Sequence, residues 1–213
     1  TRCLSDWSSD VCSSDLLKNT PMYNKTFSYS DDVTNTTKSM KYSQAFMAAA
    51  DTSGVSPYHL ASRVKQEVVI SPTTMSDSVS GTRSGYTGIY NFYNIGATNT
   101  TSGSAVNNGL KWASTGTSYL RPWNSRYRSI VGGAIYIGEK YINVGQNTSY
   151  LQKFNVTEKN RYNHQYMSNI EAPNSEATKT ASAYSATLNE MTLVFSIPVY
   201  TNMPEEVSPI PTK

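Results

Sequence analysis

The longest helical pattern in the chain, residues 125–143, constrains the fold more than any other feature. Apolar side chains recur along it at helical spacing and form one face: Ile130, Ala134, Ile137 and Tyr141. The pair Gly132-Gly133 lies within this segment and allows a neighbouring element to approach closely. An apolar face of this kind has to be covered by other elements of the fold. Further helical patterns cover residues 41–50, 57–67, 104–114 and, in patches, 163–186, where Pro173 interrupts.

The sequence predicts little β structure. Four Gly and Pro residues between Val68 and Gly88 break up a polar stretch and suggest a small hairpin or flap. Thr192–Tyr200 is the one convincing strand pattern, and residues 17–39 are polar and irregular. The tail from residue 204 is proline-rich and resembles an interdomain linker. The fold class we predict is therefore mainly α (α+β), with a small hairpin and a C-terminal strand.

Glu67 stands at the end of a predicted helix, where a carboxylate is not favoured. Ser56 is a suitable N-cap for this helix and Pro57 suits its first position. Leu60, Val64 and Glu67 fall on one stripe, and an apolar stretch follows at residues 68–70. The helix macrodipole disfavours an anion at this end by ~0.3–1 kcal/mol.

The apolar stripe adds a second effect in the same direction. Burial and the helix dipole together would raise the pKa of Glu67, as in the proton donor of a glycosidase. The structural alternative is that Glu67 turns to solvent or pairs with Arg63 one turn earlier.

Residues 1–16 contain an internal echo, Leu-Ser-Asp, Ser-Ser-Asp and Ser-Ser-Asp-Leu, and resemble translated sequencing-adapter read-through. We therefore leave them out of the fold reasoning. Both cysteines lie within this segment, so the rest of the chain offers no disulfide framework, thiol nucleophile or cysteine-based zinc site. Two histidines are too few for a histidine-based metal site, and we expect neither metal nor cofactor.

The charge and hydropathy of the chain without residues 1–16 restrict the kinds of molecule that it can bind. Without residues 1–16 the chain holds 17 basic and 12 acidic side chains, a net charge of +5 in place of +3. This modest balance suits an anionic polymer, and without a basic cluster it does not suggest nucleic acid. No apolar run approaches the ~18 residues of a membrane span. The Ser, Thr, Asn and Tyr content is typical of an extracellular protein.

Five blocks follow one another between residues 40 and 172. They are the Pro57–Glu67 helix, Gly85–Ala97, Ser129–Gly138, Tyr141–Thr148 and His164-Gln165-Tyr166. In this order they closely resemble the endo-β-N-acetylglucosaminidase domains of Gram-positive autolysins, glycoside hydrolase family 73. The resemblance implies a lysozyme-like fold, hydrolysis of peptidoglycan after N-acetylglucosamine, and a general acid at Glu67. It also implies that Tyr166 faces the cleft, where its hydroxyl could orient water or an acetamido group; the alternative is a buried, hydrogen-bonded tyrosine.

On this interpretation, residues 40–203 form the catalytic domain, 17–39 a lead-in, and 204–213 a linker to a missing C-terminal part. We expect a secreted, monomeric protein of the cell wall or extracellular space, with peptidoglycan glycan strands as its partner.

Aromatic and amide side chains supply candidate substrate contacts. Flat rings can stack on sugar faces, and amides can bond acetamido groups. The candidates are Tyr86, Asn91, Tyr93, Asn94, Trp123 and Gln165. Alternate aromatic residues in such a stretch also commonly belong to the core, which is the alternative for Tyr93 and the preferred reading for Phe92 and Ile95.

A second catalytic carboxylate is harder to find. Glycosidases that use two place them ~5–5.5 or ~6.5–9.5 Å apart. Between Glu67 and His164, Asp77 is the one acid with a plausible position. Failing Asp77, the 2-acetamido oxygen of the substrate could attack the anomeric carbon. Two functional alternatives stay open: a lytic transglycosylase or muramidase on the same fold, and a wall-binding module that has lost turnover.

Overall fold

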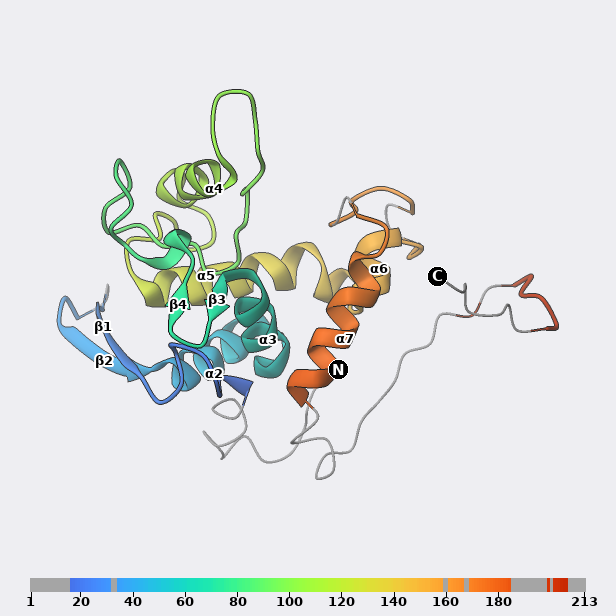
Figure 1. Cartoon of the computed structure of the whole chain (residues 1–213), viewed down its shortest axis with the longest axis horizontal. Coiled ribbons are helices and arrows are strands. Elements are labelled where there is room, and N and C mark those ends of the chain that lie inside the picture. Colours follow the sequence, from blue (N-terminus) through green and yellow to red (C-terminus); the bar gives the residue numbers. More distant parts are fainter. Residues whose placement is uncertain are drawn as a thin grey trace.

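Helices dominate the structure, a computed structural model that describes residues 16–31, 34–158, 161–166, 169–184, 199 and 201–206. In chain order the elements are β1 (Thr26–Ser30), β2 (Thr37–Lys41), α2 (Tyr42–Ser53), α3 (Pro57–Val68), β3 (Val69–Ser71), β4 (Thr74–Met75), the 3-10 helix η1 (Asp77–Val79), α4 (Ala105–Ser114), α5 (Arg126–Lys140), the 3-10 helix η2 (Ile142–Val144), α6 (Ser149–Phe154) and α7 (Ala172–Tyr184). β1 pairs with β2 and β3 with β4, both antiparallel. The mainly helical class predicted from the sequence is confirmed (Figure 1).

The centre of the fold is α2, which packs against both α5 and α3 (Figure 1). The predicted apolar face of α5 is buried, and so is the pair Gly132-Gly133. A Cβ on Gly133 would lie well inside van der Waals contact with the ring of Tyr93, and one on Gly132 would meet the carbonyl oxygen of Tyr119. The glycine pair therefore serves close packing, as predicted.

The segment before α2 differs from the irregular lead-in that we predicted. β1 and β2 pair as an antiparallel hairpin, with Thr26 opposite Lys41. Its Phe27 is 6% exposed and lies 4.9 Å from the ring of Tyr42. Leu17 and Met22 are also buried in the main core. The packed unit thus begins well before residue 40, because these apolar side chains cover one side of α2.

The first residue that the structure describes, Leu16, belongs to the segment that we left out of the fold reasoning. Leu16, the last residue of that segment, is 1% exposed and belongs to the core. Its carbonyl oxygen accepts a hydrogen bond from Nζ of Lys65 at 3.3 Å. Leu16 is therefore part of the fold, and the interpretation of residues 1–15 lies outside the described residues.

The α3 helix and the hairpin after it agree with the sequence pattern. Pro57 occupies the first turn, and Leu60, Val64 and Val68 are buried. The chain passes from Val68 directly into β3, which pairs with β4 through a register irregularity. This direct passage places the end of α3 beside the small sheet (Figure 1).

The C-terminal part contains α6 and α7, which pack against each other, and α7 lies next to α3 at the opposite end of the molecule from the β1–β2 hairpin (Figure 1). α6 was not predicted, and α7 is continuous with Pro173 in its first turn, where a proline is tolerated. The predicted strand at 192–200 and most of the predicted linker lie outside the described residues. Within the described part, every helix is too short or too polar to span a membrane.

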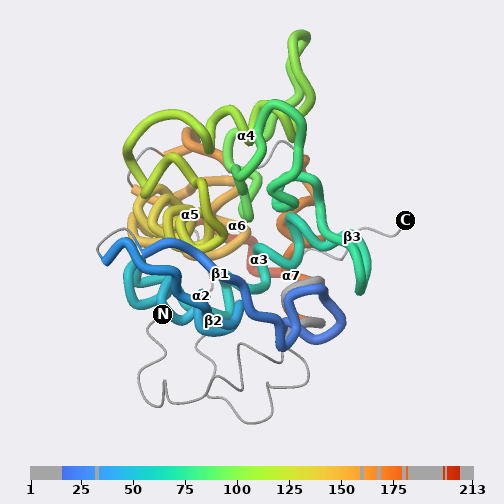
Figure 2. Tube along the Cα trace, turned by 90° about the vertical axis from the view of Figure 1, so that its left-hand side faces the viewer, coloured from blue at the N-terminus to red at the C-terminus, as the bar shows by residue number. Residues whose placement is uncertain are grey.

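The loop that precedes α4 projects away from the helices (Figure 2). An isolated bridge between Thr100 and Gly103 closes its tip. α4 itself packs against η1, so the segment after the small sheet and α4 form one side of the fold.

Candidate active site

Glu67 lies in the last turn of α3, and its side chain is 24% exposed. It is therefore neither fully buried nor free in solvent. The helix ends one residue later, so its final carbonyl groups need partners from outside the helix. One of those carbonyls belongs to Glu67 itself.

Asn94 supplies that partner. Its Nδ2 donates to the carbonyl oxygen of Glu67 at 2.8 Å and to the carboxylate Oε2 at 3.3 Å. Asn94 has a φ of 49°, a left-handed conformation that asparagine tolerates better than most residues. Asn94, one of the candidate substrate contacts, thus lies beside Glu67, and its amide holds both the main chain and the side chain of the candidate acid.

Arg63 lies one turn before Glu67 and is almost completely buried, with 3% of its side chain exposed. Its Nη1 is 4.0 Å from Oε1 of Glu67 and 2.8 Å from Oε1 of Glu176. Its Nη2 donates to Oε1 of Gln152 at 2.6 Å. The pairing with Arg63 that we considered as an alternative for Glu67 is thus present, although it is long and shared with a second carboxylate.

The aromatic ring of Tyr166 lies against the guanidinium of Arg63. The Cζ atom of Arg63 lies 4.6 Å from the centre of the Tyr166 ring, a cation–π distance. The backbone N–H of Tyr166 donates to the carbonyl oxygen of Gln152 at 2.8 Å, and its ring packs edge-on against Tyr141. Burial raises the pKa of Tyr166, Arg63 opposes the rise, and the carboxylates of Glu67 and Glu176 add to it. The Tyr166 hydroxyl is therefore neutral, and both carboxylates influence its pKa.

Glu176 was missed by the sequence reasoning, which searched for acids only between Glu67 and His164. It lies on α7, 113 residues after Arg63, and its side chain is 14% exposed. Oγ of Ser149, in the first turn of α6, donates to its second carboxylate oxygen at 3.3 Å. No local pattern marks Glu176, because its position depends entirely on how α7 docks against α3.

Three predicted substrate contacts are wrong, since the structure places them in the core. Asn91, Tyr93 and Trp123 each have 0% of their surface exposed. The Asn91 amide donates to two backbone carbonyls within the fold, those of Ile95 and Gly109. Trp123 donates its indole N–H to the carbonyl oxygen of Tyr119 at 2.7 Å. These side chains hold loops together, and a sugar cannot reach them.

Two other candidates remain predictions. Tyr86 is partly exposed in the loop after η1, and Gln165 is exposed just before Tyr166. His164 stacks on Tyr141 with ring centres 4.5 Å apart, and its Nδ1 lies 3.0 Å from Oε1 of Gln146. It thus supports the segment that carries Tyr166.

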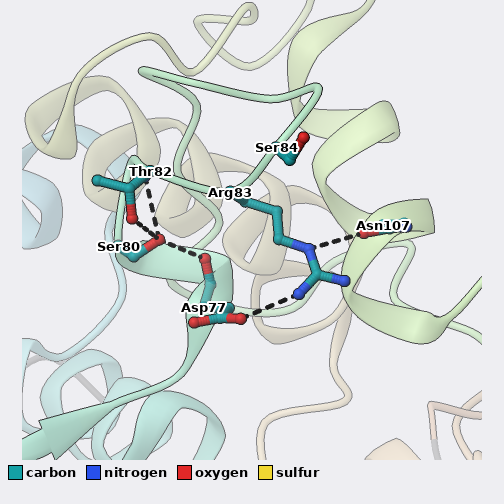
Figure 3. Close-up of a pocket in the computed structure, with 6 residues that line it drawn as sticks. All are labelled: Asp77, Ser80, Thr82, Arg83, Ser84 and Asn107. Carbon is teal, nitrogen blue, oxygen red and sulfur yellow. Dashed lines mark hydrogen bonds and ion pairs between the residues drawn. The ribbon is translucent and has the colours of Figure 1, made fainter.

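Asp77 lies in a different environment from Glu67. Its side chain is 64% exposed and pairs with Nη1 of Arg83 at 3.0 Å. Nε of Arg83 donates to Oδ1 of Asn107 on α4, so Arg83 bridges η1 and α4 (Figure 3). These residues, with Ser80, Thr82 and Ser84, line an open polar pocket of about 500 Å³.

A metal site is not indicated in the described part of the chain. Among those residues, no group of three His, Cys, Asp or Glu side chains is placed to hold an ion. The groups recorded around Glu67 are the amide of Asn94, the guanidinium of Arg63 and the phenol of Tyr166.

Comparison with known proteins adds an independent line of evidence. No family model matches the chain. The bifunctional autolysin of Staphylococcus epidermidis strain ATCC 12228 is 32% identical over 111 residues, 52% of this chain. That of Staphylococcus aureus strain MSSA476 is 36% identical over 78 residues, 37% of this chain. The chain spans less than a tenth of these relatives, 8% and 6% of their lengths.

Solved structures match over a larger part of the chain. S. aureus autolysin E has a TM-score of 0.56 and 21% identity, and the match covers 84% of this chain and 66% of that one. A catalytic mutant of autolysin E, with glutamate replaced by alanine and the disaccharide NAG-NAM bound, has a TM-score of 0.55 and 22% identity over 84% and 67% of the two chains. These likenesses establish the fold: the chain has the lysozyme-like α+β architecture that the sequence predicted.

Proposed function

We propose that this chain is the catalytic domain of a secreted peptidoglycan hydrolase that cleaves the β-1,4 bond after N-acetylglucosamine, with Glu67 as general acid. The observation that carries the proposal is the setting of Glu67. Its partly exposed carboxyl is held by Asn94 and lies 4.0 Å from the buried guanidinium of Arg63, which the Tyr166 ring covers. The local identity to staphylococcal bifunctional autolysins supports the same conclusion.

The exposure of Glu67 fits the first chemical step. A general acid has to reach the glycosidic oxygen and deliver a proton as the bond to the anomeric carbon breaks. A carboxyl with 24% of its side chain exposed is accessible to a substrate and still partly shielded from water. Asn94 limits the orientations of this carboxyl, which favours delivery of the proton in one direction.

The second step does not need Asp77 in our proposal. Asp77 is exposed and tied to Arg83, which stabilises its charge but places it in a separate pocket. We propose that the substrate's 2-acetamido oxygen attacks the anomeric carbon while Glu67 protonates the leaving oxygen. Water then attacks the anomeric carbon, displaces the acetamido oxygen from it so that the acetamido group is regenerated, and gives its proton to the Glu67 carboxylate. The Tyr166 hydroxyl, kept protonated by its surroundings, is proposed to orient the acetamido group or the water.

The proposed partner is the glycan strand of peptidoglycan, and the proposed place of action is the cell wall or the extracellular space. We expect the domain to act as a monomer.

Mass spectrometry of the fragments released from purified peptidoglycan tests the proposal. Reducing N-acetylglucosamine ends are expected from the wild type. Reducing muramic acid ends, or their anhydro form, would instead identify a muramidase or a lytic transglycosylase. A folded wild type that releases nothing would contradict enzymatic function and favour a wall-binding module.

The same assay, applied to variants of Glu67, Asp77 and Tyr166, ranks the contributions of these residues to catalysis. Glu67→Gln keeps the shape and removes the proton, so kcat should fall at least ~10²-fold. Asp77→Asn should cost the least, and Tyr166→Phe should fall between the two because it removes a neutral hydrogen bond and leaves the acid in place. A folded Asp77→Asn variant as inactive as Glu67→Gln would contradict the single-carboxylate mechanism.

A further inference from the structure

Two carboxylates share one guanidinium at the end of α3. Nη1 of Arg63 is 2.8 Å from Oε1 of Glu176 and 4.0 Å from Oε1 of Glu67. The shorter contact is a charge-assisted hydrogen bond, and the longer one is a looser electrostatic contact. Glu176 is therefore the main counter-ion of Arg63, and Glu67 is a secondary one.

The burial of Arg63 makes this division of contacts important. A guanidinium with 3% of its side chain exposed cannot be balanced by water, so it has to be balanced by neighbouring anions. If Glu176 did not provide the negative charge, Arg63 would draw that charge from Glu67. Glu67 would then be held as a carboxylate and would have no proton to donate.

The other titratable groups around Arg63 are neutral near pH 7. Burial lowers the pKa of His59 to about 3 and raises that of Tyr141 to about 12. Burial also raises the pKa of Tyr166, whose ring covers the guanidinium. Lys65, on the same helix, directs its Nζ to the carbonyl oxygen of Leu16. Among the groups whose contacts with Arg63 the described structure records, the charged ones are thus the two glutamates.

We propose that Glu176 is a positioning residue that neutralises Arg63 and thereby keeps Glu67 available as the proton donor. This inference rests on the proposed function for the role of Glu67. It assigns no contact with the substrate to Glu176, because Glu176 acts through Arg63. α7 then has a catalytic purpose, since it carries this counter-ion to the end of α3.

The pH dependence of kcat/KM tests the proposal with Glu176→Gln. The amide keeps a hydrogen-bond acceptor for Arg63 and removes the negative charge. With that charge gone, Glu67 loses its proton at lower pH, so the alkaline limb of the profile should move down by roughly one pH unit. Glu139→Gln is the matched control: it removes the same charge from an exposed site on α5 and should leave the limb in place. An unchanged limb in Glu176→Gln would overturn the inference.

Two further outcomes separate this inference from alternatives. A folded Glu176→Gln variant that is inactive at every pH would mean that Glu176 takes part in the chemistry itself, which also overturns a positioning role. If Glu176→Gln does not fold, Arg63→Gln and the double variant with both glutamines replace it. The double variant should have its alkaline limb at lower pH than Arg63→Gln, since it lacks the repulsion of Glu176, and coincident limbs would refute the proposal.

A carboxyl-carbon NMR titration of Glu67 gives a readout that does not need activity. The midpoint should fall by roughly one pH unit from wild type to Glu176→Gln and stay unchanged in Glu139→Gln. A shifted midpoint in a protein that does not hydrolyse peptidoglycan would support the charge balance and refute the proposed function. Hydrolysis by the wild type, together with an unshifted Glu67 midpoint in Glu176→Gln, would refute the charge balance and support the proposed function.

Discussion

Asn94 contributes to the site in two ways: its amide binds Glu67, and its backbone adopts a left-handed conformation. Replacing Asn94 by glycine or by alanine separates these two contributions. Its amide makes a 2.8 Å bond to the carbonyl oxygen of Glu67 and a 3.3 Å bond to the carboxylate. Its backbone has a φ of 49°, which glycine adopts freely and alanine does not. Asn94→Gly therefore removes the amide without backbone strain, whereas Asn94→Ala removes the amide and adds strain.

The bond lengths give the expected magnitudes. One net hydrogen bond contributes about 0.5–1.5 kcal/mol, and the longer bond to a partly exposed carboxylate adds a value at the lower end of that range. Asn94→Gly should thus lower the free energy of unfolding by about 1–2 kcal/mol. At about 2–4 °C per kcal/mol for a domain of this size, Tm should fall by roughly 2–8 °C. The left-handed alanine of Asn94→Ala should cost about 1 kcal/mol more and a further ~2–4 °C.

Thermal unfolding followed by circular dichroism measures these shifts, and Asn35→Gly is the control. Asn35 also has a left-handed backbone, with a φ of 51°, but it is exposed in the turn of the β1–β2 hairpin. Its replacement by glycine should change Tm by only ~1–2 °C, because the glycine effect acts mainly through the unfolded chain. Asn94→Gly should also reduce kcat about tenfold, since the carboxyl loses its orienting partner. Wild-type Tm and kcat in Asn94→Gly would refute the role of the amide, and equal Tm values for the glycine and alanine variants would refute the strain argument.

Two further predictions concern the core around the site. Gly133→Ala should lower the free energy of unfolding by about 1–3 kcal/mol, because the new methyl group would meet the Tyr93 ring and the gain in helix propensity is at most about 1 kcal/mol. In a Tyr93→Leu background the same change should cost less, and an increase in Tm on Gly133→Ala would contradict the packing. Burial lowers the pKa of His59 from 6.5 to about 3, so between these values the unfolded chain binds a proton that the folded one does not, and stability should fall as pH decreases from 6.5 toward 3. His59→Phe removes this proton uptake, and urea unfolding at pH 7 and pH 5 should show a smaller loss than in the wild type; equal losses would exclude His59 as the cause.

The sequence determined the helices that carry the candidate acid and the core. Ser56-Pro57 and the stripe of Leu60 and Val64 predicted α3, and the Gly and Pro breaks between Val68 and Gly88 predicted the small hairpin. These signals are local: capping, helix propensity and apolar periodicity act within a few residues. A small hairpin after the helix that carries Glu67 could therefore be anticipated without any tertiary information.

Local signals could not assign the aromatic and amide residues of the 85–97 block to core or cleft. Asn94 contacts Glu67, whereas its neighbour Tyr93 is buried against Gly133 and Asn91 is bonded inside the loop. In an irregular loop there is no fixed period that separates an inner from an outer face. The choice depended on where α5 and its glycines lie, which is a property of the packed structure.

The charge balance at the site is the clearest case of a feature decided by tertiary structure alone. Arg63 lies one turn from Glu67 in the sequence, and that pairing could be foreseen from the i, i+4 spacing. Glu176 reaches the same guanidinium from 113 residues away, because α7 docks beside α3. The sequence by itself thus determined which side chain is the candidate acid. Only the tertiary structure decided which charges surround it, since Coulomb energy depends on distance in space and not on separation along the chain.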